Sequence, residues 1–213
     1  MKKIQLVNAL QRFADYAKPR LELEQYSLDA VSAADVIYVA GFEHDDLVDK
    51  DVLDVGCGVG RLAGGALLFG ASRVVGLDVD LDALRTARAN LASLGNDLFA
   101  RAGLVQGDVA TAAGLLRTPG DWTVLANPPF GVHSRGADTK FVAPLLKLAN
   151  KIYVLHLGTE KVREFLARFY EDAGFHVDLV YEIDVVLPRT YRFHSKRRKR
   201  VRTNLFCLTR AMK

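Results

Sequence analysis

The stretch DVLDVGCGVGR, residues 51–61, is the most informative structural pattern in this chain of 213 residues. A short apolar run at 51–55 passes into three alternating glycines, and a helical pattern begins directly after them. A strand, a glycine-rich turn and a helix in this order are typical of the first unit of a nucleotide-binding α/β fold, because glycines let the backbone pass close to a ligand.

The same alternation continues outward from this stretch. Strands buried on both faces read as continuous apolar runs, so short apolar runs separated by helical patterns predict a parallel sheet with helices on both sides. Apolar runs at 51–55, 73–77, 103–106, 123–126 and 152–155 alternate with helical patterns at 61–69, 81–94, 109–116, 139–149 and 160–173.

The two ends of the chain follow different rules. Helical spacing at 2–17 and 28–41 predicts two helices before the first strand. Strand patterns at 175–187 and 201–208 leave no room for a crossover helix between them, so these two strands should pair antiparallel. We therefore predict a doubly wound, mostly parallel, seven-stranded Rossmann-like sheet with an antiparallel C-terminal hairpin.

We expect residues 1–213 to form a single domain. Within it, residues 1–50 form a helical extension that covers the ligand site, and residues 51–213 form the α/β core with a basic loop at 188–202. Half of the residues are hydrophobic and a quarter are charged, which excludes a disordered or disulfide-scaffold chain. Two distant cysteines and the absence of a signal segment favour the cytoplasm. No apolar run approaches the roughly 20 residues that span a bilayer, so no membrane association is expected.

Positive charge is concentrated near the C-terminus. Eight arginines and lysines lie between Arg189 and Arg202 with no acidic residue among them, and removing these 8 from the 29 basic residues leaves 21 against 25 acidic. A block of this kind favours a polyanion, and nucleic acid first. The alternative is a solvated basic loop or a localisation signal.

Acidic residues at strand ends indicate a nucleotide-type cofactor. Asp78 lies 22 positions after Gly56, where a ribose-binding carboxylate is expected. Gly58, Gly60 and Ala63 satisfy a dinucleotide fingerprint, which leaves a dehydrogenase open. Against it, Asp54 two residues before the glycine run resembles the first motif of S-adenosylmethionine-dependent methyltransferases, and Asp108 resembles the acid that receives their adenine amine.

The sequence Asn127-Pro128-Pro129-Phe130 follows the fourth predicted strand. An Asn-Pro turn is the structural alternative, but the motif resembles the Asn/Asp-Pro-Pro-Tyr/Phe signature of methyltransferases that modify a planar, conjugated nitrogen. The lone pair of such an amine is delocalised, so acceptors that hold its N–H bonds are needed to make it nucleophilic. Asn127 and the carbonyl of Pro128 would supply these acceptors, the prolines would stiffen the turn, and Phe130 would stack on a base swung out of its helix.

Two further segments resemble one family over essentially the whole chain: the methyltransferase-like-five family of small-subunit ribosomal RNA adenine-N6 methyltransferases. They are Leu23-Glu24-Gln25-Tyr26 and Tyr191-Arg192-Phe193-His194-Ser195-Lys196, although Ser27-Leu28 stands where the family has Pro-Thr. The resemblance implies S-adenosylmethionine as cofactor and ribosomal RNA as substrate. The cofactor-binding residues it implies are Gln25, Tyr26, Asp54, Gly56, Cys57, Gly58, Val59, Gly60, Asp78, Val79, Asp108, Val109 and Asn127.

The resemblance also implies that Phe193 and His194 lie at the mouth of the base pocket, or alternatively pack under a hairpin. The charged residues expected to contact RNA are Lys196, Arg197, Arg198, Lys199 and Arg200. It further implies a small zinc-containing methyltransferase activator protein that adds a strand beside the third predicted strand, at the sheet edge. The chain itself shows no histidine and cysteine spacing typical of a metal site.

Several other functions stay open from the residues alone. Methyltransferases acting on guanine N2 of ribosomal RNA, on adenine N6 of DNA or on glutamine N5 of a protein share the Asn-Pro-Pro motif. A glutamine enzyme would not explain the basic segment. A non-catalytic RNA-binding module would not explain the intact set of Asp54, Asp78, Asp108 and Asn127.

Overall fold

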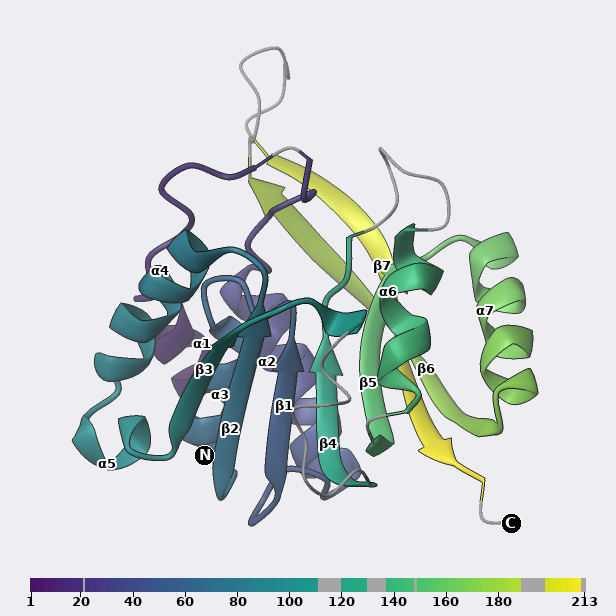
Figure 1. The fold of residues 1–213 in the computed structure, drawn as a ribbon, viewed down its shortest axis with the longest axis horizontal. Helices are drawn as coiled ribbons and strands as arrows, with labels where there is room; N and C mark the ends of the chain where they lie inside the picture. Colours follow the sequence, from purple (N-terminus) through teal and green to yellow (C-terminus); the bar gives the residue numbers. More distant parts are fainter. Residues whose placement is uncertain (21, 111–119, 130–136, 148, 189–197, 212–213) are drawn as a thin grey trace.

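A seven-stranded sheet with the strand order β3-β2-β1-β4-β5-β7-β6 forms the centre of the protein (Figure 1). The computed structural model describes residues 1–20, 22–110, 120–129, 137–147, 149–188 and 198–211. Five strands are parallel, and β7 pairs antiparallel with both β5 and β6, as the sequence predicted. The strands are β1 (Asp51–Val55), β2 (Arg73–Asp78), β3 (Ala102–Gln106), β4 (Gly120–Ala126), β5 (Ala149–Leu157), β6 (Phe175–Pro188) and β7 (Arg198–Arg210).

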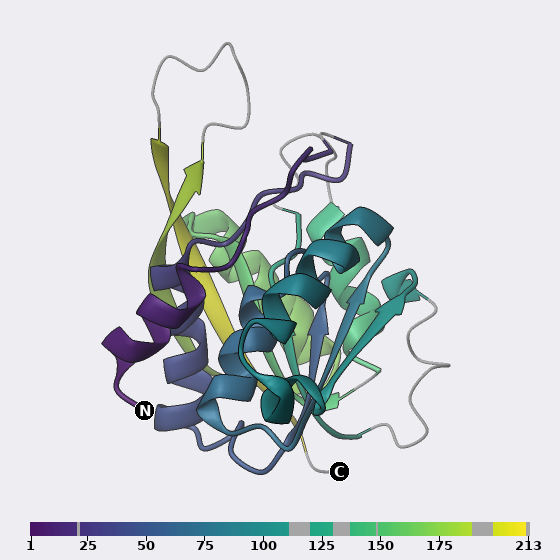
Figure 2. The ribbon, with the colours of Figure 1, turned by 90° about the vertical axis from the view of Figure 1, so that its left-hand side faces the viewer.

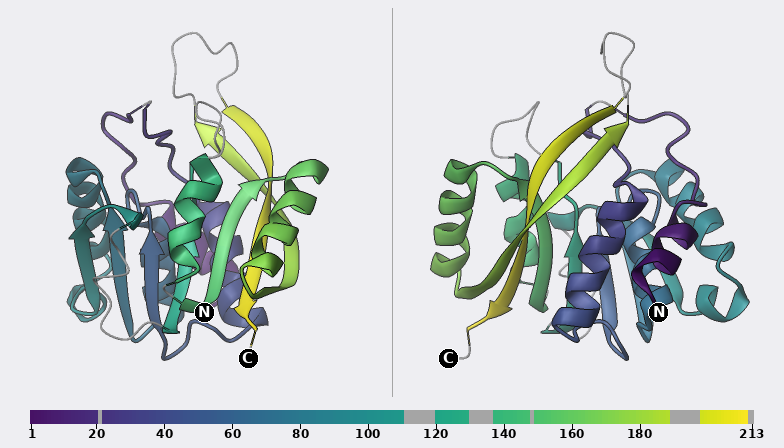
Figure 3. Two further views of the ribbon diagram at one scale, coloured as in Figure 1. Left: turned by 45° about the vertical axis from the view of Figure 1, so that its right-hand side comes forward. Right: turned by 180° about the vertical axis from the view of Figure 1, so that it is seen from behind.

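Helices cover both faces of the sheet, which confirms the doubly wound class (Figure 3). Two separate clusters of buried side chains result, one under the N-terminal helices and α3, the other under α6 and α7. The helices are α1 (Lys3–Leu10), α2 (Ala30–Tyr38), α3 (Arg61–Phe69), α4 (Leu81–Ala92), α5 (Asn96–Phe99), α6 (Ala137–Leu145) and α7 (Glu160–Asp172), and a π-helical turn, η1 (Val39–Glu43), follows α2. No helix among the described residues is both long enough and apolar enough to span a membrane.

The C-terminal hairpin extends beyond the rest of the sheet. The pairing of β5 with β7 ends at Leu157 and Thr203, whereas the pairing of β6 with β7 continues to Pro188 and Arg198. The two arms of the hairpin therefore project past the carboxyl end of β5 (Figure 2). This is the end of the sheet at which an open α/β fold places its ligands.

The N-terminal helices are shorter than their patterns predicted. The helix expected at 2–17 ends at Leu10, because the guanidinium of Arg61 takes the carbonyls of Leu10 and Phe13 from outside the helix. The helix expected at 28–41 begins at Ala30, where the Asp29 side chain caps the backbone N–H groups of Val31 and Ser32. A tertiary contact thus ends the first helix, and a local cap sets the start of the second.

The predicted positions of the remaining elements agree closely with the structure. The predicted helix at 139–149 is wrong at its C-terminal end, because Ala149 already pairs with Gly120 as the first residue of β5. The short helix α5 was not predicted, because four residues are too few to show a period. The helix predicted at 109–116 falls largely outside the described residues.

Candidate active site

Three strand ends bring the predicted motifs together. Val55 at the end of β1 pairs with Leu77 of β2 on one side and with Ala126 of β4 on the other. The glycine loop after β1, Asp78 at the end of β2 and Asn127 after β4 therefore share one edge of the sheet. This register is the reason that the glycine loop and Asn127, which lies 71 positions after Gly56, form one site.

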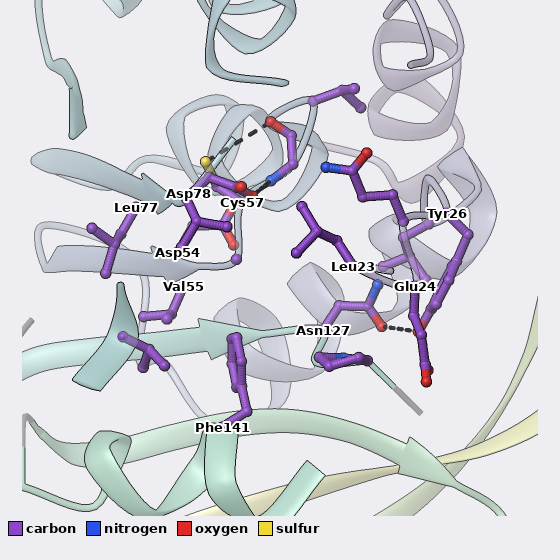
Figure 4. Close-up of a pocket in the computed structure, with 18 of the residues that line it drawn as sticks. Leu23, Glu24, Tyr26, Asp54, Val55, Cys57, Leu77, Asp78, Asn127 and Phe141 are labelled. Atoms are coloured by element: carbon purple, nitrogen blue, oxygen red, sulfur yellow. Dashed lines mark hydrogen bonds between the residues drawn. The ribbon is translucent and has the colours of Figure 1, made fainter. Parts of the chain in front are cut away.

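A cavity of about 280 Å³ lies at this edge, between the strand ends and the N-terminal segment (Figure 4). We call residues 14–20 and 22–28 the strap, because they cross over the cavity. Leu23 of the strap projects toward the middle of the cavity from the side opposite Asp54. The predicted cofactor residues that line it are Gln25, Tyr26, Asp54, Gly56, Cys57, Gly58, Val59, Asp78, Val79, Asp108, Val109 and Asn127.

The glycine loop is shaped by its positive φ angles and by close neighbours. Gly56 and Gly58 have φ of 67° and 53°, which favour residues without a side chain. A Cβ atom on Gly58 would lie 2.1 Å from the hydroxyl of Tyr16, so only glycine fits beneath the strap. Gly60 does not line the cavity; a Cβ atom there would press on Ala87 of α4, so this glycine serves packing.

Asp54 is the most deeply buried acid of the site. Its side chain is 1% exposed, and its Oδ2 accepts the backbone N–H of Ala63 at 2.8 Å. Burial raises the pKa of Asp54 to about 7, although the hydrogen bond from Ala63 acts in the opposite direction. Such a carboxyl favours a positively charged ligand group, because a cation nearby stabilises its ionised form.

Asp78 lies at the end of β2 and accepts two backbone N–H groups, from Gly58 at 2.8 Å and from Asp80 at 2.9 Å. Burial raises its pKa, which these hydrogen bonds partly offset. For Asp80, burial alone would raise the pKa, but hydrogen bonds from Gln25 and the Asp82 N–H, together with Arg20, lower it. Asp80 is therefore charged at neutral pH.

Asn127 follows β4 directly and faces the strap. Its Oδ1 lies 3.2 Å from the hydroxyl of Tyr26, and the carbonyl oxygen of Pro128 lies 3.3 Å from the same hydroxyl. Figure 4 shows the first of these contacts as a dashed line between Asn127 and Tyr26. The two acceptors that the sequence assigned to a substrate amine thus converge on one point.

The strap is fastened at both of its ends. The buried guanidinium of Arg61 donates to the carbonyl oxygens of Leu10, Phe13 and Leu28. The Asn90 side chain accepts from the N–H of Ala14 and donates to its carbonyl. Helices α3 and α4 therefore hold the strap over the cavity.

Gln25 holds the middle of the strap. Its Nε2 donates to Asp80 at 2.7 Å, and its Oε1 accepts the N–H of Arg20 at 2.8 Å. Both ends of the amide are engaged by the protein, so the structure places Gln25 beside the cavity as a fastening of the strap.

The hydroxyl of Ser27 is a buried polar group in the cavity wall. In the described part of the chain, this hydroxyl makes no hydrogen bond. A polar ligand would remove the cost of this unpaired group. Together with three acids along the wall, Asp54, Asp78 and Asp108, it fits a cofactor that combines hydroxyl groups with positive charge.

Several predicted residues cannot be placed. Phe130, Phe193, His194, Lys196 and Arg197 lie outside the described residues, and for Arg198 and Lys199 only the backbone is described. Arg200 is exposed on the projecting arm of β7. Within the described ranges, no group of three histidine, cysteine or acidic side chains could hold a metal ion.

Sequence reasoning missed several wall residues. Tyr16 and Phe141 come from elements whose apolar patterns predicted only packing. Arg61 offered one signal, because an arginine directly after a glycine loop is unusual on a buried helix face, where arginine is found only when it is paired.

A glycine loop after β1, an acid at the end of β2 and an Asn-Pro-Pro turn after β4, all around one cavity, define an S-adenosylmethionine-dependent methyltransferase of class I. Residues 36–112, which we call the cofactor half because they contain the glycine loop, Asp78 and Asp108, match the family described as ribosomal protein L11 methyltransferase (PrmA). The crystal structure of PH1948 from Pyrococcus horikoshii, described as an RNA methyltransferase candidate, superposes with a TM-score of 0.87 at 27% identity, covering 100% of this chain and 99% of that one.

Curated relatives match over nearly the full length. The rRNA N(6)-adenosine-methyltransferase METTL5 of Danio rerio is 32% identical over 199 residues, 92% of this chain and 93% of that protein. The Drosophila melanogaster protein Mettl5 is 30% identical over 97% of this chain and 95% of that protein. An uncharacterized protein of Methanocaldococcus jannaschii, MJ0284, is 32% identical over 92% of this chain and 89% of that protein. The chain belongs to the METTL5 family of rRNA N(6)-adenosine methyltransferases.

Proposed function

We propose that this protein transfers a methyl group from S-adenosylmethionine to the N6 amine of an adenosine in small-subunit ribosomal RNA. The observation that carries the proposal is the convergence of Asn127 Oδ1 and the Pro128 carbonyl on one point at the cavity mouth. Membership of the METTL5 family supports the adenosine and the ribosomal RNA.

Each polar residue around the cavity is assigned to one part of S-adenosylmethionine. We assign Asp78 to the ribose hydroxyls and Asp108 to the adenine amine, since Asp78 ends β2, Asp108 follows β3 and both line the cavity. Asp54 and Ser27 take the methionine end. When bound, S-adenosylmethionine supplies an electrophilic methyl group whose transfer to nitrogen breaks the carbon–sulfur bond and leaves the electron pair on sulfur.

The Asn-Pro-Pro turn prepares the amine. Asn127 Oδ1 and the Pro128 carbonyl accept the two N–H bonds of adenine N6, which favours a pyramidal nitrogen whose lone pair is available. The turn is stiff, so these acceptors need little reorganisation during the reaction. Line-up of nitrogen and methyl carbon then accounts for catalysis without a covalent intermediate, and the proton that the methylated nitrogen loses passes to water.

We assign the C-terminal hairpin, with its basic loop at 188–202, to binding of the RNA backbone. Its arms project past the same end of the sheet at which the cavity opens, and Arg200 and Arg202 are exposed on β7. Arginine and lysine contacts with phosphates position a nucleic acid without reading its sequence. We also propose that Phe130, Phe193 and His194 contact the target base, as the sequence predicts.

The position of β3 in the sheet supports a partner. This strand stands at one end of the sheet order, and among the described residues it pairs with β2 alone. An uncovered edge strand can receive a strand from another protein, so we propose that the small zinc-containing activator expected from the family resemblance binds there. We likewise propose that residues 1–213 act as a single domain in the cytoplasm.

Methylation of total RNA with labelled S-adenosylmethionine, followed by separation of ribosomal subunit RNAs and nucleoside analysis, tests the proposal. We expect label in N6-methyladenosine of small-subunit RNA. Because the cofactor half resembles a ribosomal protein methyltransferase, ribosomal proteins are the control substrate and should stay unlabelled. Label in protein, or in another nucleoside, would refute the assignment.

A further inference from the structure

The Tyr26 hydroxyl occupies the point on which the two amine acceptors converge. It lies 3.2 Å from Asn127 Oδ1 and 3.3 Å from the Pro128 carbonyl oxygen. These are hydrogen-bond distances for a donor, and an adenine nitrogen held by the same two acceptors would need the same space. The hydroxyl and the target amine therefore cannot be present together.

The hydroxyl is a poorer match to this point than an amine. Burial raises the pKa of Tyr26 well above its ordinary value, although its hydrogen bond to Asn127 acts to lower it, so the hydroxyl keeps its proton. It carries a single hydrogen for two acceptors, whereas a primary aromatic amine carries two N–H donors. An amine that displaces Tyr26 satisfies both acceptors in full, and a base with a carbonyl at this position offers neither donor.

We propose that Tyr26 is a specificity-determining residue whose hydroxyl stands in for the target amine and must withdraw before an adenine enters. This inference rests on the proposed function of Asn127 and Pro128. Tyr26 lowers the apparent affinity for every incoming base, because only the fraction of protein in the open state can bind one.

The attachments of the strap confine the movement that this requires. Arg61 holds the carbonyl of Leu28 two residues after Tyr26, and Asn90 holds Ala14 on the other side. Between them, Gln25 is tied to Asp80, and its Oε1 also closes a turn with the N–H of Arg20. Withdrawal of Tyr26 is thus a local opening of the strap, not the release of the N-terminal helices.

The variant Tyr26→Phe removes the hydroxyl and keeps the ring. With an in vitro transcript of small-subunit ribosomal RNA, we expect KM for RNA to fall about two- to tenfold, the range of one net hydrogen bond. Tyr26 also lines the cofactor cavity, so these assays are run at saturating S-adenosylmethionine, and kcat should not fall. The matched control is Tyr181→Phe, which removes a hydroxyl bonded to Glu43, a residue outside the cavity, and should leave KM and kcat at their wild-type values.

A second measurement needs no RNA. Trypsin cleavage after Arg20 in the strap, followed by mass spectrometry of the peptide that begins at residue 21, reports the open fraction when opening is fast relative to cleavage. Cleavage should accelerate about two- to tenfold in Tyr26→Phe, again the effect of one hydrogen bond. It should also accelerate in Asn127→Ala, which removes an acceptor from the other side, and stay unchanged in Tyr181→Phe.

The outcomes separate the two proposals. A wild-type protein that leaves the transcript unmethylated would refute the proposed function, while the cleavage rates would still test the strap. A higher KM or a lower kcat in Tyr26→Phe would show that the hydroxyl acts in the reactive complex and would overturn the inference. Unchanged cleavage in both Tyr26→Phe and Asn127→Ala would overturn it as well.

Discussion

One oxygen of Asp78 accepts the backbone N–H of Gly58 at 2.8 Å, so the acid that ends β2 also holds the glycine loop that follows β1. The second oxygen accepts the N–H of Asp80. The side chain assigned to the ribose therefore positions both loops of the cofactor half. A substitution here removes a ligand contact and loosens the loops at the same time.

The variant Asp78→Ala should weaken the binding of S-adenosylmethionine by roughly 1–3 kcal/mol, because the ribose hydroxyls lose a charged acceptor. Titration calorimetry measures the change. Asp97→Ala, which removes an exposed acid in α5 away from the cavity, is the control and should bind like the wild type. Equal affinity of Asp78→Ala and the wild type would remove Asp78 from the cofactor site.

The variant Asn127→Ala should separate cofactor binding from catalysis. Its acceptor serves the reacting amine, so the rate should fall on the order of a hundredfold or more, while cofactor affinity stays close to that of the wild type. Single-turnover methylation and calorimetry give the two values. Asn96→Ala, at an exposed asparagine of α5, should change neither. Near-normal turnover of Asn127→Ala would contradict the role assigned to it.

The pKa of Asp54, about 7 in the folded protein, predicts two pH dependences. An exposed aspartate has a pKa of about 3.9. Between about pH 4 and pH 7, the Asp54 carboxyl therefore keeps a proton in the folded protein that it loses in the unfolded chain. The free energy of unfolding should fall as the pH rises through this window. Cofactor affinity should rise over the upper part of the same window, because the positively charged ligand favours the ionised carboxyl.

Thermal unfolding from pH 4.5 to 7.5 and calorimetry from pH 5.5 to 7.5 measure the two effects. In Asp54→Asn the part of each pH dependence that Asp54 causes should disappear, and binding should be weak throughout. A wild-type affinity that is flat over this range would show that Asp54 does not exchange a proton when the cofactor binds.

The basic segment should determine the salt dependence of RNA binding. Replacing Arg197, Arg198 and Lys199 together with alanine should flatten the slope of log affinity against log salt by roughly 2 units, at about 0.7 to 0.9 per lost phosphate contact. The loss should be similar for RNAs of different sequence, and cofactor affinity should not change.

A matched control removes the same charge from α7, through Lys161, Arg163 and Arg168. This control should keep the wild-type slope. If the variant of the basic segment also keeps it, the segment is a solvated loop and the RNA contacts lie elsewhere.

Much of the fold could be predicted because strands buried on both faces leave uninterrupted apolar runs. β1 and α3 were predicted to the residue, since the glycine loop fixes the boundary between them. The ends of α1 and α6 were not predictable, because they depend on Arg61 and on the pairing of Ala149, contacts that span distant parts of the chain.

The candidate site divides in the same way. Asp54 and Asp78 lie at the carboxyl ends of β1 and β2, and Asn127 directly follows β4, so the order of strands in the sheet brings them together. The sequence could not predict that Tyr16 and Ser27 line the cavity, or that both ends of the Gln25 amide form hydrogen bonds. These features depend on the path of the strap, which has no regular hydrogen-bond pattern and hence no period in the sequence.

The Arg61 guanidinium has a consequence for how this protein can be dissected. It sits 8% exposed at the start of α3 and takes its carbonyl partners from the chain before residue 29. A truncated chain that starts at β1 would lose these three carbonyls and would also uncover the apolar side chains of α3 that pack against the N-terminal segment, among them Leu62, Ala63 and Leu67. The first 28 residues are therefore part of the folding unit, and the activity of a shortened protein would report on its folding as well as on substrate contacts.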